Sequence, residues 1–320
     1  FTPFIPMFKD IGAPKPLLLA GSEGTGGLPD PDDCEIVLLG TGADTMLGGI
    51  REFQAALRDL PQEALDRIDA WDPDREAVVM QTFLDTEYAV AGRTPYGSRP
   101  HAWLALEDKM VIDAVWDAAG VPRAQVEIVA ANAEDLVAAS RRIDAGAGVV
   151  WTADNKEGWH GGAEYSRHVV DPDTATEAIE FMAWHAGRVR VMPFLEGVPC
   201  AIHGLVFPDA VATFRPAEMV VFREAATNKF RYASCATSWD PPPERREEMR
   251  ELARTVGAHL RDEYGFAGMF TMDGVLTADG FRPTELNPRY GAGIGTIGRA
   301  SGLPLLGISR MLIEGETDGL

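Results

Sequence analysis

Cysteine, lysine and several metal-binding motifs are scarce or missing in this chain of 320 residues. The three cysteines, Cys34, Cys200 and Cys235, are odd in number and far apart, which is typical of a reducing compartment and predicts no disulfide framework. No CxxC or HExxH motif occurs, and only five lysines are present. The cysteine pattern therefore argues against a secreted, disulfide-stabilised protein.

Long apolar runs and net positive charge are also missing. No run approaches the roughly 20 apolar residues that cross a bilayer, and the N-terminus lacks the basic and then apolar pattern of a signal peptide. The formal charge of −20 leaves no net basic surface for nucleic acid or an anionic membrane. We therefore expect a cytoplasmic protein. Because the chain starts at Phe1 and stops at Leu320, it is also consistent with a fragment of a longer protein.

The hydrophobic content of 46% is enough for a large core, and the length predicts two or more domains or subdomains. Within residues 1–100, an apolar strand over 35–40 leads through two glycines into a helical pattern over 46–60, and a second strand starts at 77–80. This order of elements is Rossmann-like. However, neither a full GxGxxG fingerprint nor a following acid is present, so we reject dinucleotide binding.

The most informative stretch, residues 268–289, follows a long amphipathic helix that begins at Pro241–Pro243 and ends at Gly265. Apolar and β-branched runs flank Ala278-Asp279-Gly280, which predicts a hairpin with a three-residue connection. A turn centred on Asp279 places Asp273 opposite Glu285, and Thr271 opposite Asn287. Because side chains alternate between the two faces of a strand, Asp273, Glu285 and Asn287 then share one face.

Two carboxylates with Cβ atoms roughly 5 Å apart repel each other unless a cation or a shared proton lies between them. Two acids and one amide oxygen are hard ligands that fit Mg²⁺, completed by substrate phosphates, better than zinc or copper. The alternative is a solvated hairpin with scattered acids. Pro283 cannot donate to a strand ladder and allows the pairing to slip by one residue.

Lys109 is a candidate phosphate ligand. Apolar residues at helical spacing predict a helix that starts near Glu107 or Asp108 and is stopped by Gly120 and Pro122. A lysine in the first turn opposes the helix dipole, which indicates an anion held close by. The alternative is an exposed surface lysine.

The segment 154–163 is a glycine-rich loop that follows a predicted strand over 147–152. Backbone N–H groups at Gly161 and Gly162, together with the charge of Lys156, could cover a phosphate group. His160 lies in the same loop, but no second ligand stands at helical spacing from it, which favours a loop residue over a metal ligand.

Two further strands are expected within 188–195 and 201–207, and the first of these ranges contains Pro193. Pro193 removes a backbone donor, which suits a linker between two subdomains whose edge groups could recognise a flat ring. The candidate ring contacts are Met192, Pro193, Phe194, Leu195 and Glu196.

In this order the parts resemble the ATP-grasp superfamily over roughly residues 100–315. Asp108-Lys109, before a helix that ends in Gly-Val-Pro, is similar to the family's first nucleotide lysine. Residues 148–163 resemble its flexible lid, and residues 191–206 its adenine hinge. The hairpin resembles its metal-binding region, with Asp273, Glu285 and Asn287 as the magnesium ligands and Arg289 as the arginine beside the phosphates.

The resemblance implies an α/β (α+β) protein with an ATP-grasp fold. Residues 1–100 would form a Rossmann-like pre-ATP-grasp domain, 101–190 the linker helix and lid subdomain, and 191–320 the C-terminal subdomain with the metal site. It implies ATP and Mg²⁺ as cofactors, with Arg289 and Lys156 in catalytic roles.

The implied activity is carboxylate–amine ligation through an acyl phosphate, with release of ADP and phosphate. The partners would be a small carboxylic acid and an amine such as an amino acid or peptide, with a homodimer as a candidate assembly. The phrases over 199–204 and 279–285 look most like the peptide ligases of pheganomycin-type natural-product pathways.

Two departures from the family pattern leave other activities open. The lid strand usually carries a lysine, but Val149-Val-Trp-Thr152 has none, so that Lys156 is a candidate substitute for it. Cys200 stands nearest the place of the usual ribose-binding glutamate. A carboxylase-like or purine-pathway ligase, and a nucleotide-binding regulatory protein without catalysis, therefore remain alternatives.

Overall fold

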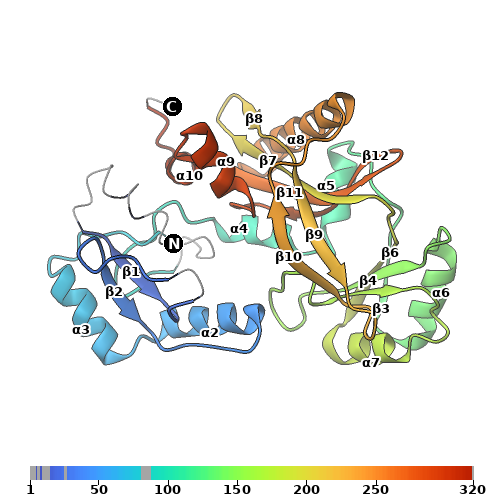
Figure 1. Ribbon diagram of the computed structural model, residues 1–320, viewed down its shortest axis with the longest axis horizontal. Helices are drawn as coiled ribbons and strands as arrows, with labels where there is room; N and C mark the ends of the chain where they lie inside the picture. The colour runs from blue at the N-terminus through green and yellow to red at the C-terminus, as the bar shows by residue number, and fades with distance from the viewer. Residues whose placement is uncertain (1–4, 6–7, 9–14, 25–26, 81–87, 319–320) are drawn as a thin grey trace. The chain divides into compact units, whose positions relative to one another are not determined.

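The computed structural model describes residues 5, 8, 15–24, 27–80 and 88–318. The chain divides into two compact units, residues 1–98 and residues 99–320, each with its own buried apolar clusters (Figure 1). No helix among the described residues is long and apolar enough to cross a membrane.

The N-terminal unit contains one pair of parallel strands and two helices among its described residues. These are β1 (Leu17–Ala20), β2 (Glu35–Leu38), α2 (Met46–Arg58) and α3 (Gln62–Trp71). The strand and helix expected at 35–40 and 46–60 are confirmed, whereas β1 was not predicted because its short apolar run stands among glycines and prolines. The strand expected at 77–80 is wrong, since Val79 makes only an isolated bridge to Pro95. The Rossmann-like architecture remains a prediction.

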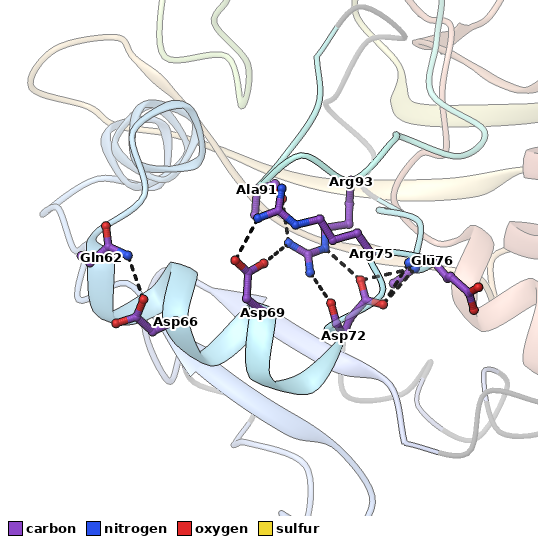
Figure 2. A network of polar contacts seen from close by, with 9 residues as sticks. Gln62, Asp66, Asp69, Asp72, Arg75, Glu76, Ala91 and Arg93 are labelled. Atoms are coloured by element: carbon purple, nitrogen blue, oxygen red, sulfur yellow. Dashed lines mark hydrogen bonds and ion pairs between the residues drawn. The ribbon is translucent and has the colours of Figure 1, made fainter.

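Arg93 holds the irregular segment that follows α3 in the N-terminal unit (Figure 2). Arg93 is 3% exposed, and its guanidinium donates to Asp69 Oδ1 at 2.5 Å and to Asp72 Oδ2 at 2.8 Å. It also donates to the carbonyls of Ala91 and Asp72. One buried cation therefore fixes the end of α3 and the turn at residues 91–93 to each other.

The second unit contains a small antiparallel sheet with the strand order β3-β6-β4-β5. Its strands are β3 (Glu127–Ala130), β4 (Val149–Ala153), β5 (Ser166–Val169) and β6 (Arg188–Pro193), and its helices are α6 (Ala133–Ile143) and α7 (Thr176–His185). Figure 1 shows both helices beside this sheet at the lower right. The glycine-rich segment 154–163 joins β4 to β5.

A larger sheet of six strands has the order β10-β9-β7-β11-β12, with β8 paired to β7. Its strands are β7 (Val198–Val206), β8 (Val211–Thr213), β9 (Ala217–Arg223), β10 (Phe230–Ala236), β11 (Gly268–Thr277) and β12 (Gly280–Asn287). Helix α8 (Pro243–Tyr264) covers one face, where its buried Met249, Ala253, Val256 and Leu260 pack with Ile202, Met272 and Leu286. Gly265 ends α8 in the left-handed conformation, as predicted.

The remaining helices of this unit are short. They are α4 (His101–Leu104), the 3₁₀ turn η2 (Ala105–Glu107), α5 (Ile112–Ala118), α9 (Ile294–Ser301) and α10 (Leu305–Glu314). The expected start of the helix, near Glu107 or Asp108, is wrong, because α5 begins at Ile112. Asp108 is extended, with ψ of 118°, and its Oδ1 accepts from the N–H of Met110 at 2.9 Å, which interrupts the helix. Lys109 therefore precedes α5 instead of lying in its first turn.

Candidate phosphate and metal site

The β11–β12 hairpin places the predicted ligands on one face. Asp273 pairs with Glu285 and Thr271 pairs with Asn287, which confirms the predicted register at this end. Beyond Asp273 the register shifts by one, so that Gly274 pairs with Pro283 and the turn has two residues instead of three. Pro283 has no N–H to donate, and the extra residue, Thr284, is accommodated beside it, where its hydroxyl donates to the Asp273 carbonyl at 3.2 Å.

The two facing carboxylates have different partners. Asp273 Oδ2 accepts from the Asn287 amide at 2.9 Å, and Lys109 Nζ lies 3.2 Å from Glu285 Oε1. Burial, and after it the negative charge of Glu285, raises the pKa of Asp273 to about 7. The negative charge of the two carboxylates is therefore more than the single ammonium group of Lys109 balances.

Arg289 joins this group through Asn287. Its Nη2 donates to Asn287 Oδ1 at 2.8 Å, and its Nε donates to Glu107 Oε1 at 3.2 Å. Glu107 is buried and also accepts from Arg99 and from Trp159 Nε1, the latter at 2.5 Å. The structure therefore brings Lys109 and Arg289 to the predicted ligands from separate parts of the chain.

Sequence reasoning missed Glu107, Arg99 and Trp159. Burial of Glu107 favours its neutral form, but the charges of Arg289 and Arg99 hold the pKa of this carboxyl below its usual value. The only signal in the sequence was a tryptophan within a glycine-rich loop, and no spacing rule links it to an acid 52 positions earlier.

The donor set at the hairpin fits a hard divalent cation. Among the described residues, no three His, Cys, Asp or Glu side chains come together as a metal site. A cation here would rest on Asp273, Glu285 and the amide oxygen of Asn287, with water and phosphate as its other ligands. Such incomplete protein coordination is common for Mg²⁺. The raised pKa of Asp273 agrees with a place that a cation would neutralise.

The candidate residues Lys156 and His160 of the glycine-rich loop lie in two different environments. Lys156 Nζ donates to the carbonyl of Trp184 on α7 at 3.2 Å, so the structure does not bring it to the hairpin. His160 is buried, stacks on Tyr165 with ring centroids 4.5 Å apart, and has Nε2 3.2 Å from the Ala153 carbonyl. Burial, and then the charge of Lys109, lowers the pKa of His160 to about 4.

The two candidate glycines of the loop have different environments. A Cβ at Gly161 would lie 3.0 Å from the Trp159 ring, so a larger residue here would require the ring to shift by a few tenths of an ångström. Gly162 has a φ of 65°, a backbone conformation that by itself favours glycine. Their N–H groups as phosphate ligands remain a prediction.

The hinge segment joins the two sheets. Met192 and Pro193 end β6, where they pair with Val150 and Val149 of β4. Phe194 donates its N–H to the Gly148 carbonyl at 2.8 Å, and its ring stacks on His168 at 4.1 Å. Leu195 is half-buried and Glu196 is exposed, after which the chain enters β7 of the larger sheet.

Cys200 does not face the candidate site. Asp273 pairs with Ala201, so the next residue, Cys200, points to the opposite face of β7 and packs in the core beneath α8. Burial raises the pKa of its thiol to about 12. The cysteine nearest the expected ribose-binding position is therefore a core residue.

Comparisons with known proteins support the fold. No protein-family model matches the sequence, and no curated protein matches it. Among solved structures, the D-alanine–D-alanine ligase from Coxiella burnetii is 17% identical with a TM-score of 0.52, over 68% of this chain and 60% of the ligase. The chain thus spans less than two thirds of that protein.

Two other solved structures cover more of this chain. The biotin carboxylase domain of Hydrogenobacter thermophilus 2-oxoglutarate carboxylase, in complex with MgADP, ADP and bicarbonate, is 14% identical with a TM-score of 0.66, over 99% of this chain and 68% of that one. The ADP complex of purK, N5-carboxyaminoimidazole ribonucleotide synthetase, is 13% identical with a TM-score of 0.55, over 95% and 75%. These likenesses show that the chain has the predicted α/β ATP-grasp fold.

Proposed function

We propose that the protein is a MgATP-dependent carboxylate–amine ligase. The observation that carries the proposal is the meeting of Lys109 with Glu285 at 3.2 Å, beside Asp273 and within the same group as Asn287 and Arg289. Two acids, one amide and two cations in one place can bind both a divalent metal ion and a polyphosphate. The solved structures with this fold include ligases and ADP complexes, which agrees with the proposal.

Each residue has a proposed role. Asp273, Glu285 and Asn287 would hold Mg²⁺, which would neutralise part of the negative charge on the phosphates of ATP. Lys109 would stabilise negative charge on the transferring γ-phosphoryl group, and Arg289 charge on the same group after its transfer. The hinge residues 192–196 would contact the adenine ring. Gly161 and Gly162 would donate N–H groups to phosphate, and Lys156 would need to leave Trp184 to assist them.

The reaction needs no side-chain nucleophile. An oxygen of the substrate carboxylate forms a bond to the γ-phosphorus, and the bond from phosphorus to the ADP oxygen breaks. The amine nitrogen then attacks the acyl carbon, inorganic phosphate leaves, and the amine proton passes to solvent. The chain's contribution is to hold the phosphates and neutralise their charge, which accounts for most catalysis in phosphoryl transfer. Peptide bond formation in a natural-product pathway is the narrower proposal within this class.

A second candidate is a carboxylase-type or purine-pathway ligase that activates bicarbonate or a nucleotide acid. The biotin carboxylase domain and purK align over 99% and 95% of this chain, compared with 68% for the D-alanine–D-alanine ligase. The position of Lys156 on Trp184 favours a third candidate, a nucleotide-binding protein without turnover.

The first test is incubation with MgATP and either pooled amino acids and short peptides or bicarbonate, with products resolved by mass spectrometry. ADP together with a new amide is expected. Glu285→Ala should abolish turnover with an unchanged circular dichroism spectrum. Asp279→Ala, at the exposed turn of the same hairpin, should leave turnover unchanged. AMP as the product, or wild-type turnover in Glu285→Ala, would contradict the proposal.

A further inference from the structure

A chain of four hydrogen bonds connects the glycine-rich loop to the acidic hairpin. Trp159 Nε1 donates to Glu107 Oε2 at 2.5 Å, and Arg289 Nε donates to Glu107 Oε1 at 3.2 Å. Arg289 Nη2 then donates to Asn287 Oδ1 at 2.8 Å, and Asn287 Nδ2 donates to Asp273 Oδ2 at 2.9 Å. A displacement of Trp159 can therefore affect the candidate metal ligand Asp273 through this chain of hydrogen bonds.

Trp159 has further neighbours besides Glu107. Besides the bond to Glu107, its ring lies 5.8 Å from the Arg289 guanidinium carbon, within the range of a cation–π interaction. Its own loop covers the ring at Gly161, where a Cβ would come within 3.0 and 3.1 Å of two ring atoms. The loop is thus folded closely around this indole.

Glu107 is the centre of the arrangement. Its side chain is buried between Arg99 and Arg289, whose charges keep the pKa of the carboxyl low. Without this negative charge, two arginines would lie close together in a buried place with no acid between them, which is unfavourable. Glu107 is therefore ionised at neutral pH and fixes Arg289 by charge as well as by geometry.

We propose that Glu107 is a positioning residue for Arg289, and that Trp159 couples the position of the glycine-rich loop to that arginine. In the structure Oε2 accepts from the indole, Oε1 accepts from Arg99 and from the Nε of Arg289, and Nη2 of the same guanidinium donates to Asn287. Without the indole, the carboxylate can accept two bonds from Arg289, because arginine and carboxylate favour a bidentate pair. Arg289 would then turn away from Asn287. In its kinetic consequences this inference rests on the proposed function.

The first test reads the contacts without any substrate. In ¹⁵N-labelled protein, the Trp159 indole resonance is assigned by its loss in Trp159→Phe, and the Arg289 Nε–H resonance by its loss in Arg289→Lys. Glu107→Gln should move the indole resonance, because a neutral acceptor makes a weaker hydrogen bond than a carboxylate. Trp159→Phe should move the Arg289 resonance. Trp184→Phe, a change at a tryptophan that is 76% exposed on α7, should move neither.

The second test reads the kinetic consequence. Trp159→Phe should lower kcat about tenfold and change the KM for ATP much less, because a positioning contact acts on the transition state more than on binding. Glu107→Gln should lower kcat further, and Glu107→Asp should restore part of the loss. An unchanged Arg289 resonance in Trp159→Phe, in a variant with a wild-type melting temperature, overturns the inference. Absence of ligation by the wild-type protein refutes the proposed function alone, since the resonances still decide the coupling.

Discussion

The packing around Phe270 allows a quantitative test of how the larger sheet is packed. Phe270 on β11 pairs directly with Gly204 on β7, and its ring is fully buried. A Cβ at Gly204 would lie 2.2 and 2.4 Å from two ring atoms, whereas ordinary contacts of a Cβ are 3.4–4 Å. On the helix side, a Cβ at Gly257 of α8 would lie 3.0 Å from the same ring. The ring therefore fills a slot between two glycines.

Gly204→Ala forces the Phe270 ring away from β7 by about 1 Å and toward α8, which confines the ring on its other side. Overpacking of this kind costs about 1–3 kcal/mol, and we expect the upper end because strand and helix both confine the ring. For a unit of this size, about 3 kcal/mol corresponds to a fall in Tm of roughly 6–12 °C. Because Asp273 stands three residues after Phe270 on β11, the substitution should also disturb the acidic hairpin.

The assay is thermal and urea unfolding followed by circular dichroism. Gly307→Ala is the matched control, because it lies in α10 with nothing within 4 Å of a new Cβ, and alanine should stabilise the helix by about 0.5–1 kcal/mol. The double variant Gly204→Ala/Phe270→Leu should recover at least about 1 kcal/mol relative to the sum of the single changes. A Gly204→Ala protein as stable as the wild type, or strictly additive single changes, would refute this account of the packing.

Three further predictions concern pH, the N-terminal unit and the hinge. Burial lowers the pKa of His203 to about 4, so below about pH 6.5 the unfolded chain binds a proton that the folded chain does not. The free energy of unfolding should therefore fall by up to roughly 3 kcal/mol between about pH 6.5 and 4, measured by urea titrations. This part of the pH dependence should be missing in His203→Asn. Arg93→Met should destabilise the N-terminal unit by about 1–3 kcal/mol, measured by faster hydrogen exchange in α3, whereas Arg75→Met at its exposed bond to Asp69 should have little effect. Gly197→Ala places a Cβ 2.3 Å from the Leu276 carbonyl at a φ of 156°, and calorimetry should show weaker ATP binding if the hinge contacts the nucleotide.

Local patterns predicted the regular parts of the second unit. Alternation along residues 268–289 predicted that Asp273 faces Glu285, because side chains in a strand repeat every two residues and a short turn sets the register. The helical spacing of Met249, Ala253, Val256 and Leu260 predicted the buried stripe of α8. The same rules failed where local chemistry intervened, at Asp108, which interrupts a helix, and at Pro283, which shifts the hairpin register.

The environment of the acidic hairpin depended on contacts that no local rule describes. Glu107 meets Arg289 across 182 positions and Trp159 across 52, and neither pair has a periodic signal. Cys200 was assigned to a place near the nucleotide by its position in the sequence, but its face of β7 belongs to the core beneath α8.

The sequence by itself therefore determined which residue types carry the chemistry and how each lies on its own strand or helix, because those properties depend on neighbours a few positions away. Only the tertiary structure decided that Lys109 pairs with Glu285, that Lys156 lies against Trp184, and that Glu107 joins the loop to Arg289. Such pairings follow from how sheets and helices pack, and they place charges side by side that are far apart along the chain.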